Sequence, residues 1–221
     1  MNNPYNREYF NKQFLGYAFS KEKRKIFQYH LNILFSMKNK IKTVLDIGCA
    51  FGYFLSLCDK VGIKTYGLEV SDYAINEAKK YTQAEIRKPV KLNSLFINER
   101  FDVITAFDVL EHLNNDKRIL KFAYDRLKTD GILYGTTPNA KYFLNRLFGE
   151  ADPTHINVHG AVYWFNLLRD IGFRDIKIKY IFAFGFPPNP ALRAKMGVVY
   201  IKPIFIPLEV LGQEILFIAT K

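Results

Sequence analysis

An α/β fold, with a mostly parallel sheet and helices on both faces, is predicted by three features of the 221-residue sequence. Apolar, strand-like runs alternate with helix-like runs between residues 43 and 173, which is the pattern of strands joined by crossover helices. A glycine-rich turn follows the first strand-like run, and an acid ends the second. The length and the 49% hydrophobic content suit one globular domain of this Rossmann-like class.

The predicted elements follow one another along most of the chain. Strand-like runs are found at residues 43–47, 64–69, 90–92, 101–106 and 131–135. Runs with helical periodicity and suitable boundary residues are found at residues 52–61, 72–81, 114–127 and 161–171. Ser71 and either Asn114 or Asn115 are expected to be N-caps. Alternating polarity predicts two more strands, at residues 175–182 and 213–220.

The turn after the first strand is suited to close contact with a ligand. Its small residues Gly48, Ala50 and Gly52 allow the backbone to approach a bound molecule, and the next helix presents free N–H groups there. A dinucleotide would place its pyrophosphate at this turn, where the carboxylate of Asp46 would repel it. Asp46 therefore favours a cationic or hydroxyl-rich ligand.

A second acid, Glu69, ends the second predicted strand, 69 − 52 = 17 positions after Gly52. A carboxylate at the tip of this strand can accept both hydroxyl groups of a ribose. Two acids without a basic phosphate clamp favour a nucleoside that carries no phosphate.

These residues resemble the motifs of the class I S-adenosylmethionine-dependent methyltransferases. The similarity covers residues 43–173 and includes 101–113 and 127–139, which are similar to the fourth and fifth strands of that family. Ala50 replaces the middle glycine of the first motif, which is tolerable at a negative φ and strained at a positive one. The small-molecule branch, which includes ubiquinone-biosynthesis O-methyltransferases, is the most similar, because a Glu-His pair follows the fourth strand. It also has a His-rich loop like residues 152–159, and its C-terminal strands form an antiparallel edge pair.

The resemblance implies that S-adenosylmethionine is the cofactor. In that family the first turn surrounds the methionine and ribose parts, the acid after the second strand binds the ribose, and the next residue contacts adenine. Residues after the third strand flank the adenine amine, and those after the fourth face the methionine. The matching positions here are Asp46, Gly48, Cys49, Ala50, Gly52, Glu69, Val70, Asn93, Ser94, Phe107 and Asp108.

Methyl transfer from a sulfonium is a direct displacement, so the protein mainly aligns the reactants and excludes water. For an oxygen nucleophile a general base would help, and the candidates are His155, as first choice, His112 and His159. A lone histidine is more often structural, where it hydrogen-bonds a loop carbonyl. The predicted function is methyl transfer to a small-molecule acceptor, at oxygen.

A metal site is not predicted. Asp152, His155 and His159 have a spacing that would suit metal ligands on a helix. Pro153 and Gly160 disfavour the helix that would align them.

Four other functions make different demands on the sequence. An NAD-linked oxidoreductase would need a glycine where Tyr53 stands, and Asp46 would oppose it. RNA methylation is disfavoured because residues 107–110 lack the Asn-Pro-Pro-Tyr type of motif. An RNA methyltransferase, a lipid-associated methyltransferase and a non-catalytic nucleoside-binding protein remain alternatives.

The net charge of +11 is uneven along the chain. Residues 1–42 hold nine Lys or Arg against two Glu, and apolar residues recur there at helical spacing. This segment is predicted to be a basic helical cap beside the cofactor site, preceding a methyltransferase domain over residues 43–221. Binding of an anionic substrate, a membrane or RNA is the alternative for its lysines.

Residues 183–212 form an apolar, proline-rich segment that is unusually long for a connection. A substrate lid or a homodimer interface is the preferred explanation, and contact with a membrane surface is the alternative. The two cysteines lack metal or extracellular spacing, and no signal peptide or run of 18 apolar residues is present. The expected location is the cytoplasm.

Overall fold

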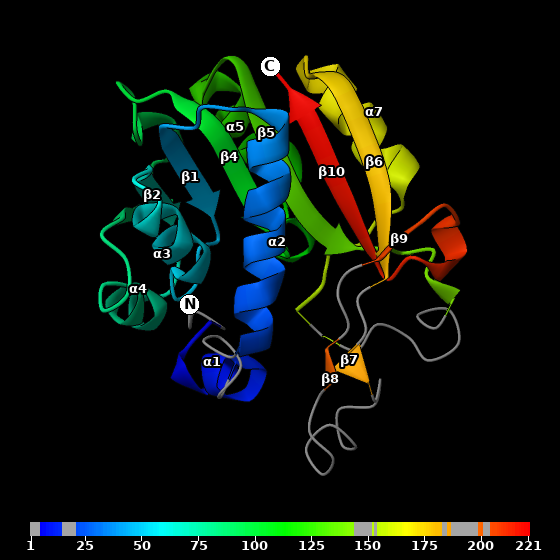
Figure 1. The fold of residues 1–221 in the computed structure, drawn as a ribbon, viewed down its shortest axis with the longest axis horizontal. Coiled ribbons are helices and arrows are strands. Elements are labelled where there is room, and N and C mark those ends of the chain that lie inside the picture. The colour runs from blue at the N-terminus through cyan, green and yellow to red at the C-terminus, as the bar shows by residue number, and fades with distance from the viewer. Residues whose placement is uncertain are drawn as a thin grey trace.

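A computed structural model describes residues 5–14, 21–143, 152, 154–182, 185–186, 199–200 and 204–221. The described chain contains an eight-stranded sheet of order β3-β2-β1-β4-β5-β10-β6-β9 (Figure 1). Its strands are β1 (Thr43–Ile47), β2 (Lys64–Leu68), β3 (Glu85–Arg87), β4 (Phe101–Phe107), β5 (Leu127–Pro138), β6 (Arg174–Phe182), β9 (Ile204–Ile206) and β10 (Glu214–Thr220). A separate pair consists of β7 (Gly185–Phe186) and β8 (Val199–Tyr200).

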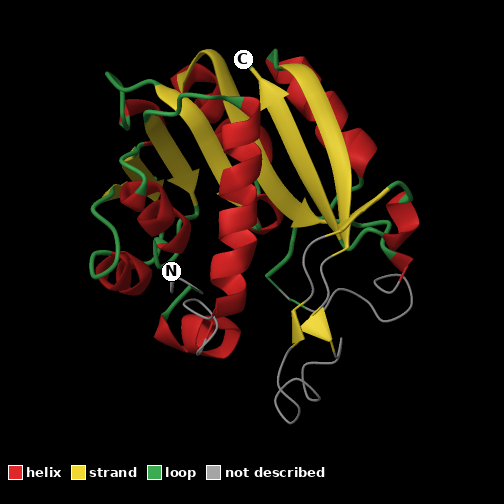
Figure 2. Ribbon diagram, in the orientation of Figure 1, coloured by secondary structure: helices red, strands yellow, loops and turns green. Residues whose placement is uncertain are grey.

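Helices cover both faces of the sheet, with α2 and α3 on the near face and α5 and α7 behind it (Figure 2). The helices are α1 (Arg7–Phe14), α2 (Lys21–Met37), α3 (Tyr53–Lys60), α4 (Asp72–Ala78), α5 (Asp116–Arg126) and α7 (Ala161–Ile171). Short 3-10 turns are η1 (Leu92–Ser94), η2 (Leu110–His112) and η3 (Glu209–Leu211). Ser71 and Asn115 are the N-caps of α4 and α5, and each side chain accepts a backbone N–H, as predicted.

The pairing of the strands determines which edge of the sheet carries the predicted site. Strands β1 to β5 pair in parallel, so their carboxyl ends lie along one edge. Strand β10 pairs antiparallel with both β5 and β6, which confirms the predicted fold class. At the opposite edge from β3 lies β9, which pairs with β6 and was not predicted.

The predicted strand at residues 90–92 was wrong. The third strand is instead Glu85–Arg87, and Leu92 begins a 3-10 turn. Strand β3 pairs only with β2, so it is an edge strand, and edge strands commonly carry charged, exposed residues. The apolar Val90 is 79% exposed, so its side chain does not belong to a buried strand.

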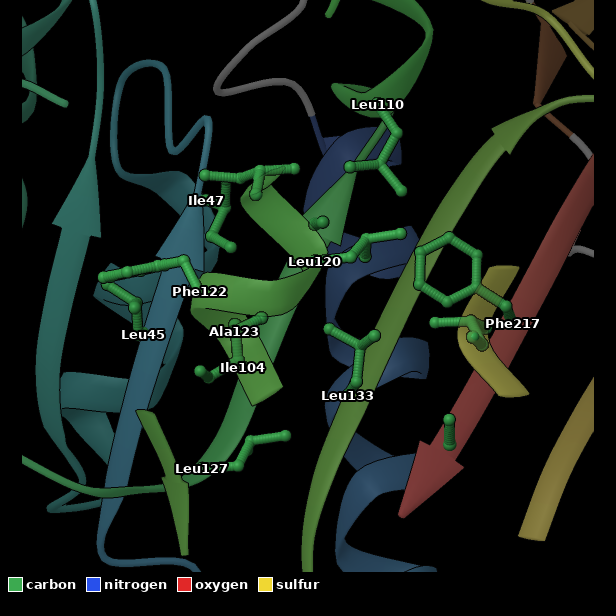
Figure 3. Packing of buried hydrophobic residues seen from close by; sticks show 14 of the residues in the cluster. Leu45, Ile47, Ile104, Leu110, Leu120, Phe122, Ala123, Leu127, Leu133 and Phe217 are labelled. Atoms are coloured by element: carbon green, nitrogen blue, oxygen red, sulfur yellow. The ribbon is translucent and has the colours of Figure 1, made fainter. Parts of the chain in front are cut away.

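Each face of the sheet has its own hydrophobic core. On the α5 side, Leu120 and Ala123 pack against Leu45, Ile104 and Leu133 of the central strands (Figure 3). On the α2 side, the core is shared between the sheet, α3 and two fully buried residues of α2, Leu31 and Leu34. Helix α2 is thus one wall of the core, while the division of the chain at residue 42 stays a prediction.

Candidate active site

The turn between β1 and α3 requires glycine at two of its positions. Gly48 and Gly52 have φ angles of +73° and +68°, which residues other than glycine rarely adopt. A Cβ atom on Gly48 would lie 2.5 Å from Val109 Cγ2, and one on Gly52 would lie 2.7 Å from Thr82 Cγ2. Both glycines are therefore needed for conformation and for space.

Ala50, the departure from the family motif, has a φ of +46°. An alanine at this position is strained when its φ is positive, as it is here. An alanine in the left-handed region costs about 1 kcal/mol more than a glycine does. The turn therefore holds a strained residue at the point where its backbone faces Glu69.

We expect Ala50→Gly to stabilise the protein by roughly 0.5–1 kcal/mol, because the gain from relieved strain exceeds the added entropy of the unfolded chain. The free energy of unfolding in urea, compared with that of wild type, tests this. Destabilisation by the glycine would show that the strain at Ala50 does not exist in solution.

Glu69 joins the two loops that form the cofactor crevice. Its buried carboxylate accepts the backbone N–H of Ala50 at 2.9 Å through Oε2, and those of Val70 and Ser71 at 2.8 and 2.9 Å through Oε1. Burial raises the pKa of Glu69, and the three hydrogen bonds oppose that rise. A carboxylate has about four acceptor positions, so capacity remains for a ligand hydroxyl.

Asp46 lies beside Glu69 in the same crevice and is also buried. Its Oδ1 accepts a hydrogen bond from Thr105 Oγ1 at 2.7 Å. Burial raises the pKa of Asp46 to about 7, with a further contribution from the charge of Glu69. A cation placed in this crevice would favour the ionised form of both acids.

A pH dependence of stability follows from Asp46. Because its folded pKa lies above the unfolded value of 3.8, the stabilisation that Asp46 contributes is present at low pH and is lost as the pH rises from about 4 to 7. Between pH 5 and pH 8 we expect wild type to lose roughly 2 to 3 kcal/mol relative to Asp46→Asn. Urea unfolding of both proteins at the two pH values measures the difference. A difference that does not change with pH would contradict the raised pKa.

Three other predicted cofactor residues lie around the crevice. Cys49 is buried behind the turn, and its Sγ would lie 2.7 Å from a Cβ on Gly67. Val70 is 40% exposed directly after Glu69, where adenine was expected. Asp108 is exposed with a φ of +48° and accepts a hydrogen bond from Thr136 Oγ1 at 2.8 Å.

Phe107 was predicted to face the methionine portion of the cofactor, but its side chain points into the core. Its ring packs under α2 against Phe27, His30 and Phe54, with centroid distances of 5.0 to 5.2 Å. The aromatic core on that face therefore holds the side chain, and only the backbone of Phe107 is left to face the carboxyl edge.

Asn93 and Ser94 do not directly follow a strand. They belong to η1, and the Asn93 carbonyl accepts a hydrogen bond at 2.7 Å from Arg126, the last residue of α5. The end of α5 lies towards the amino edge of the sheet, away from Glu69. The correct register of β3 instead places Lys88 next to the crevice, because Glu69 N donates to Arg87 O. The strand was misplaced, and the role of Asn93 and Ser94 beside adenine stays a prediction.

A second group of side chains lies where β4 leads into α5, next to the crevice because Val109 packs on Gly48. Glu111 is fully buried, and its Oε1 has no hydrogen-bond partner among the described residues. His155 Nε2 lies 4.0 Å from that oxygen, and the rings of His112 and His155 are 4.8 Å apart. Burial raises the pKa of Glu111 well above its usual value, and Asp108 adds to the rise.

The loop that carries His155 is tied to Glu111 and His112. Glu111 O accepts the N–H groups of residues 156 and 157, both at 2.9 Å. His112 Nδ1 lies 3.1 Å from Thr154 O and 3.0 Å from Thr154 Oγ1. Asp152 accepts the Thr154 hydroxyl at 2.6 Å and lies 3.9 Å from His155 Nε2. Two segments about 40 residues apart thus present one cluster.

His159, the third predicted base, occupies a different environment. Its Nε2 lies 2.7 Å from Asn157 Oδ1, and its ring stacks on Tyr163 at 3.6 Å. These contacts are typical of a histidine with a structural role, the alternative to a catalytic one.

A cation could be held at this cluster by Glu111, His112 and His155, whose candidate ligand atoms all lie within 4.8 Å of one another. On the sequence, a metal site was disfavoured because Asp152, His155 and His159 are not aligned on one helix. The structure groups His155 with Glu111 and His112 instead, and these residues do not need a common helix.

A methyltransferase domain model matches residues 6–178. The chain belongs to this methyltransferase family. A ubiquinone biosynthesis O-methyltransferase of Glaesserella parasuis is 28% identical over 166 residues, which are 66% of this chain and 70% of that protein. One from Coxiella burnetii is 31% identical over 134 residues, but only 58% of this chain and 53% of that protein are matched. A SAM-dependent methyltransferase from Archaeoglobus fulgidus has the same fold, with a TM-score of 0.69 at 20% identity over 97% of this chain and 99% of that one.

These matches confirm the resemblance to class I methyltransferases, whose cofactor is S-adenosylmethionine, and the protein is an enzyme of that class. In this methyltransferase, Thr154 and Glu111 belong to the histidine cluster, and no motif in the sequence predicts a role for Thr154. Only the Glu-His pair of the resemblance pointed to Glu111. Within the described residues, no helix has the length and apolar character needed to cross a bilayer.

Proposed function

We propose that the methyltransferase transfers a methyl group from S-adenosylmethionine to an oxygen of a small-molecule acceptor. The observation that carries the proposal is the buried, unpaired Oε1 of Glu111 facing His155, beside the crevice of Asp46 and Glu69. The matched O-methyltransferases support oxygen as the methylated atom.

The chemistry of the reaction assigns different tasks to the two groups of residues. Asp46 and Glu69 bind the cationic nucleoside and hold its methyl group near the acceptor. His155 receives the acceptor's hydroxyl proton, and the carboxylate of Asp152, 3.9 Å from its Nε2, stabilises the resulting imidazolium, while the buried Glu111 lies 4.0 Å from the same nitrogen. The hydrogen bonds from His112 to Thr154 keep the loop in place.

A divalent cation is a second candidate at the same cluster, because a buried, unpaired carboxylate next to two imidazoles is a suitable ligand set. Such a cation would lower the pKa of an acceptor hydroxyl. Dialysis against EDTA separates the candidates. Turnover that survives chelation assigns the proton to His155, and turnover that is lost and returns with Mg²⁺ or Zn²⁺ assigns a cation to the cluster.

We also propose that the partner is a small molecule and not a nucleic acid, and that the enzyme acts in the cytoplasm, where the buried free thiols of Cys49 and Cys58 stay reduced. Contact with a membrane or formation of a homodimer through residues 183–212 falls largely outside the described residues.

Calorimetry with S-adenosylhomocysteine tests the cofactor part of the proposal, and micromolar or tighter binding is expected. A screen that follows donor consumption over phenols, sugars and small acids tests the acceptor part. Lack of binding to wild type would refute the assignment, and turnover only with amines would refute oxygen as the acceptor atom.

A further inference from the structure

The short helix α1 lies beyond the carboxyl ends of β1 and β2, at the lower end of α2 (Figure 1). Its Phe10 is only 4% exposed. The Phe10 ring is 5.1 Å from that of Phe51, in the β1–α3 turn, and 6.1 Å from that of Tyr73, at the start of α4. The rings of Phe51 and Tyr73 are themselves 5.9 Å apart. Phe10 therefore packs against both the β1–α3 turn and the start of α4, on either side of the predicted cofactor site.

Two tyrosines connect the same segment to the histidine cluster. The Tyr5 ring lies edge-on to His112 with a centroid distance of 5.8 Å, and the Tyr9 hydroxyl is hydrogen-bonded to Thr154. Burial raises the pKa of Tyr5, with contributions from the charges of Asp152, Glu69 and Glu111, which belong to both groups of the site. Tyr9 contacts both Tyr5 and Phe10, with centroid distances of 5.1 and 5.3 Å.

The size of α1 decides what these contacts mean. A helix of eight residues is marginal in isolation, so its position depends on the aromatic contacts that hold it on the domain. Because Phe10 contacts segments on both sides of the predicted cofactor site, α1 would have to move for a nucleoside as large as S-adenosylmethionine to enter or leave. Once seated, the same helix brings Tyr9 to Thr154, which holds His112 and Asp152.

We propose that α1 closes over the bound cofactor and that closure completes the acceptor site, with Tyr9 as a positioning residue for Thr154 and His112. This inference rests on the proposed function. It implies an ordered reaction, in which the cofactor binds before the acceptor, because the acceptor site is assembled only when α1 is seated.

The closing role is tested by the dissociation rate of S-adenosylhomocysteine, measured by rapid displacement. Phe10→Ala is expected to raise this rate at least tenfold, while Phe165→Ala, which removes an exposed ring on α7, leaves it unchanged. Equal rates in the two variants would overturn the lid. Lack of binding by wild type would instead refute the proposed function. Phe10→Leu serves as the second variant if the alanine protein does not fold.

The positioning role is tested by turnover. Tyr9→Phe is expected to lower kcat five- to tenfold with an unchanged dissociation constant for S-adenosylhomocysteine, and Tyr29→Phe is the matched control. The double variant Tyr9→Phe with Thr154→Val should be no slower than Thr154→Val alone, because the two hydroxyls act through one hydrogen bond. A wild-type kcat in Tyr9→Phe, or additive losses in the double variant, would overturn the role.

Discussion

Replacing Glu69 with alanine is expected to weaken the binding of S-adenosylhomocysteine by roughly 100-fold or more. One hydrogen bond from a ribose hydroxyl to the remaining acceptor position of this buried carboxylate accounts for up to about 3 kcal/mol, which corresponds to that factor. The variant also frees the N–H groups of Ala50, Val70 and Ser71, so the two loops of the crevice lose their common acceptor. Isothermal titration calorimetry with wild type and variant measures the change.

Glu85→Ala is the matched control, because Glu85 is an exposed acid on the neighbouring strand β3. Its affinity should equal that of wild type. Glu69→Gln should bind almost as weakly as Glu69→Ala, because its amide group would present donors to backbone N–H donors. Affinity within threefold of wild type in Glu69→Ala would place the ribose elsewhere.

The first half of the site could be predicted from the sequence because its residues are close together along the chain and follow local rules. Asp46, Gly48 and Gly52 lie in or next to one turn. A position that needs a positive φ is usually glycine, so such a turn can be recognised in the sequence. Helix α7 was predicted to the residue, since Gly172 ends it in the left-handed conformation.

The rest depends on contacts between distant segments. His112 meets Thr154 across 42 positions, and Tyr5 meets His112 through the packing of a short helix. Neither contact follows a periodic pattern. Strand β3 was misplaced for a related reason, because an edge strand has a single neighbour and its charged residues carry no apolar signal.

Replacing His155 with glutamine is expected to lower kcat by roughly 100-fold or more, because general-base catalysis contributes about that much. Glutamine keeps a hydrogen-bonding group between Glu111 and Asp152 but cannot take up the acceptor proton. Affinity for S-adenosylhomocysteine should stay at the wild-type level, since the residues proposed to bind the cofactor are Asp46 and Glu69. Steady-state kinetics with the best acceptor, together with calorimetry, separates the two effects.

His159→Gln is the informative comparison for that experiment. Its ring stacks on Tyr163 and contacts Asn157, so its loss should lower the melting temperature and leave kcat of the folded enzyme unchanged. His155→Gln should show the opposite pattern, with a large loss of kcat at a nearly unchanged melting temperature. Equal turnover in wild type and His155→Gln would remove His155 as the base. Proton transfer would then be assigned to solvent, with Glu111 left as the buried group that orients the acceptor.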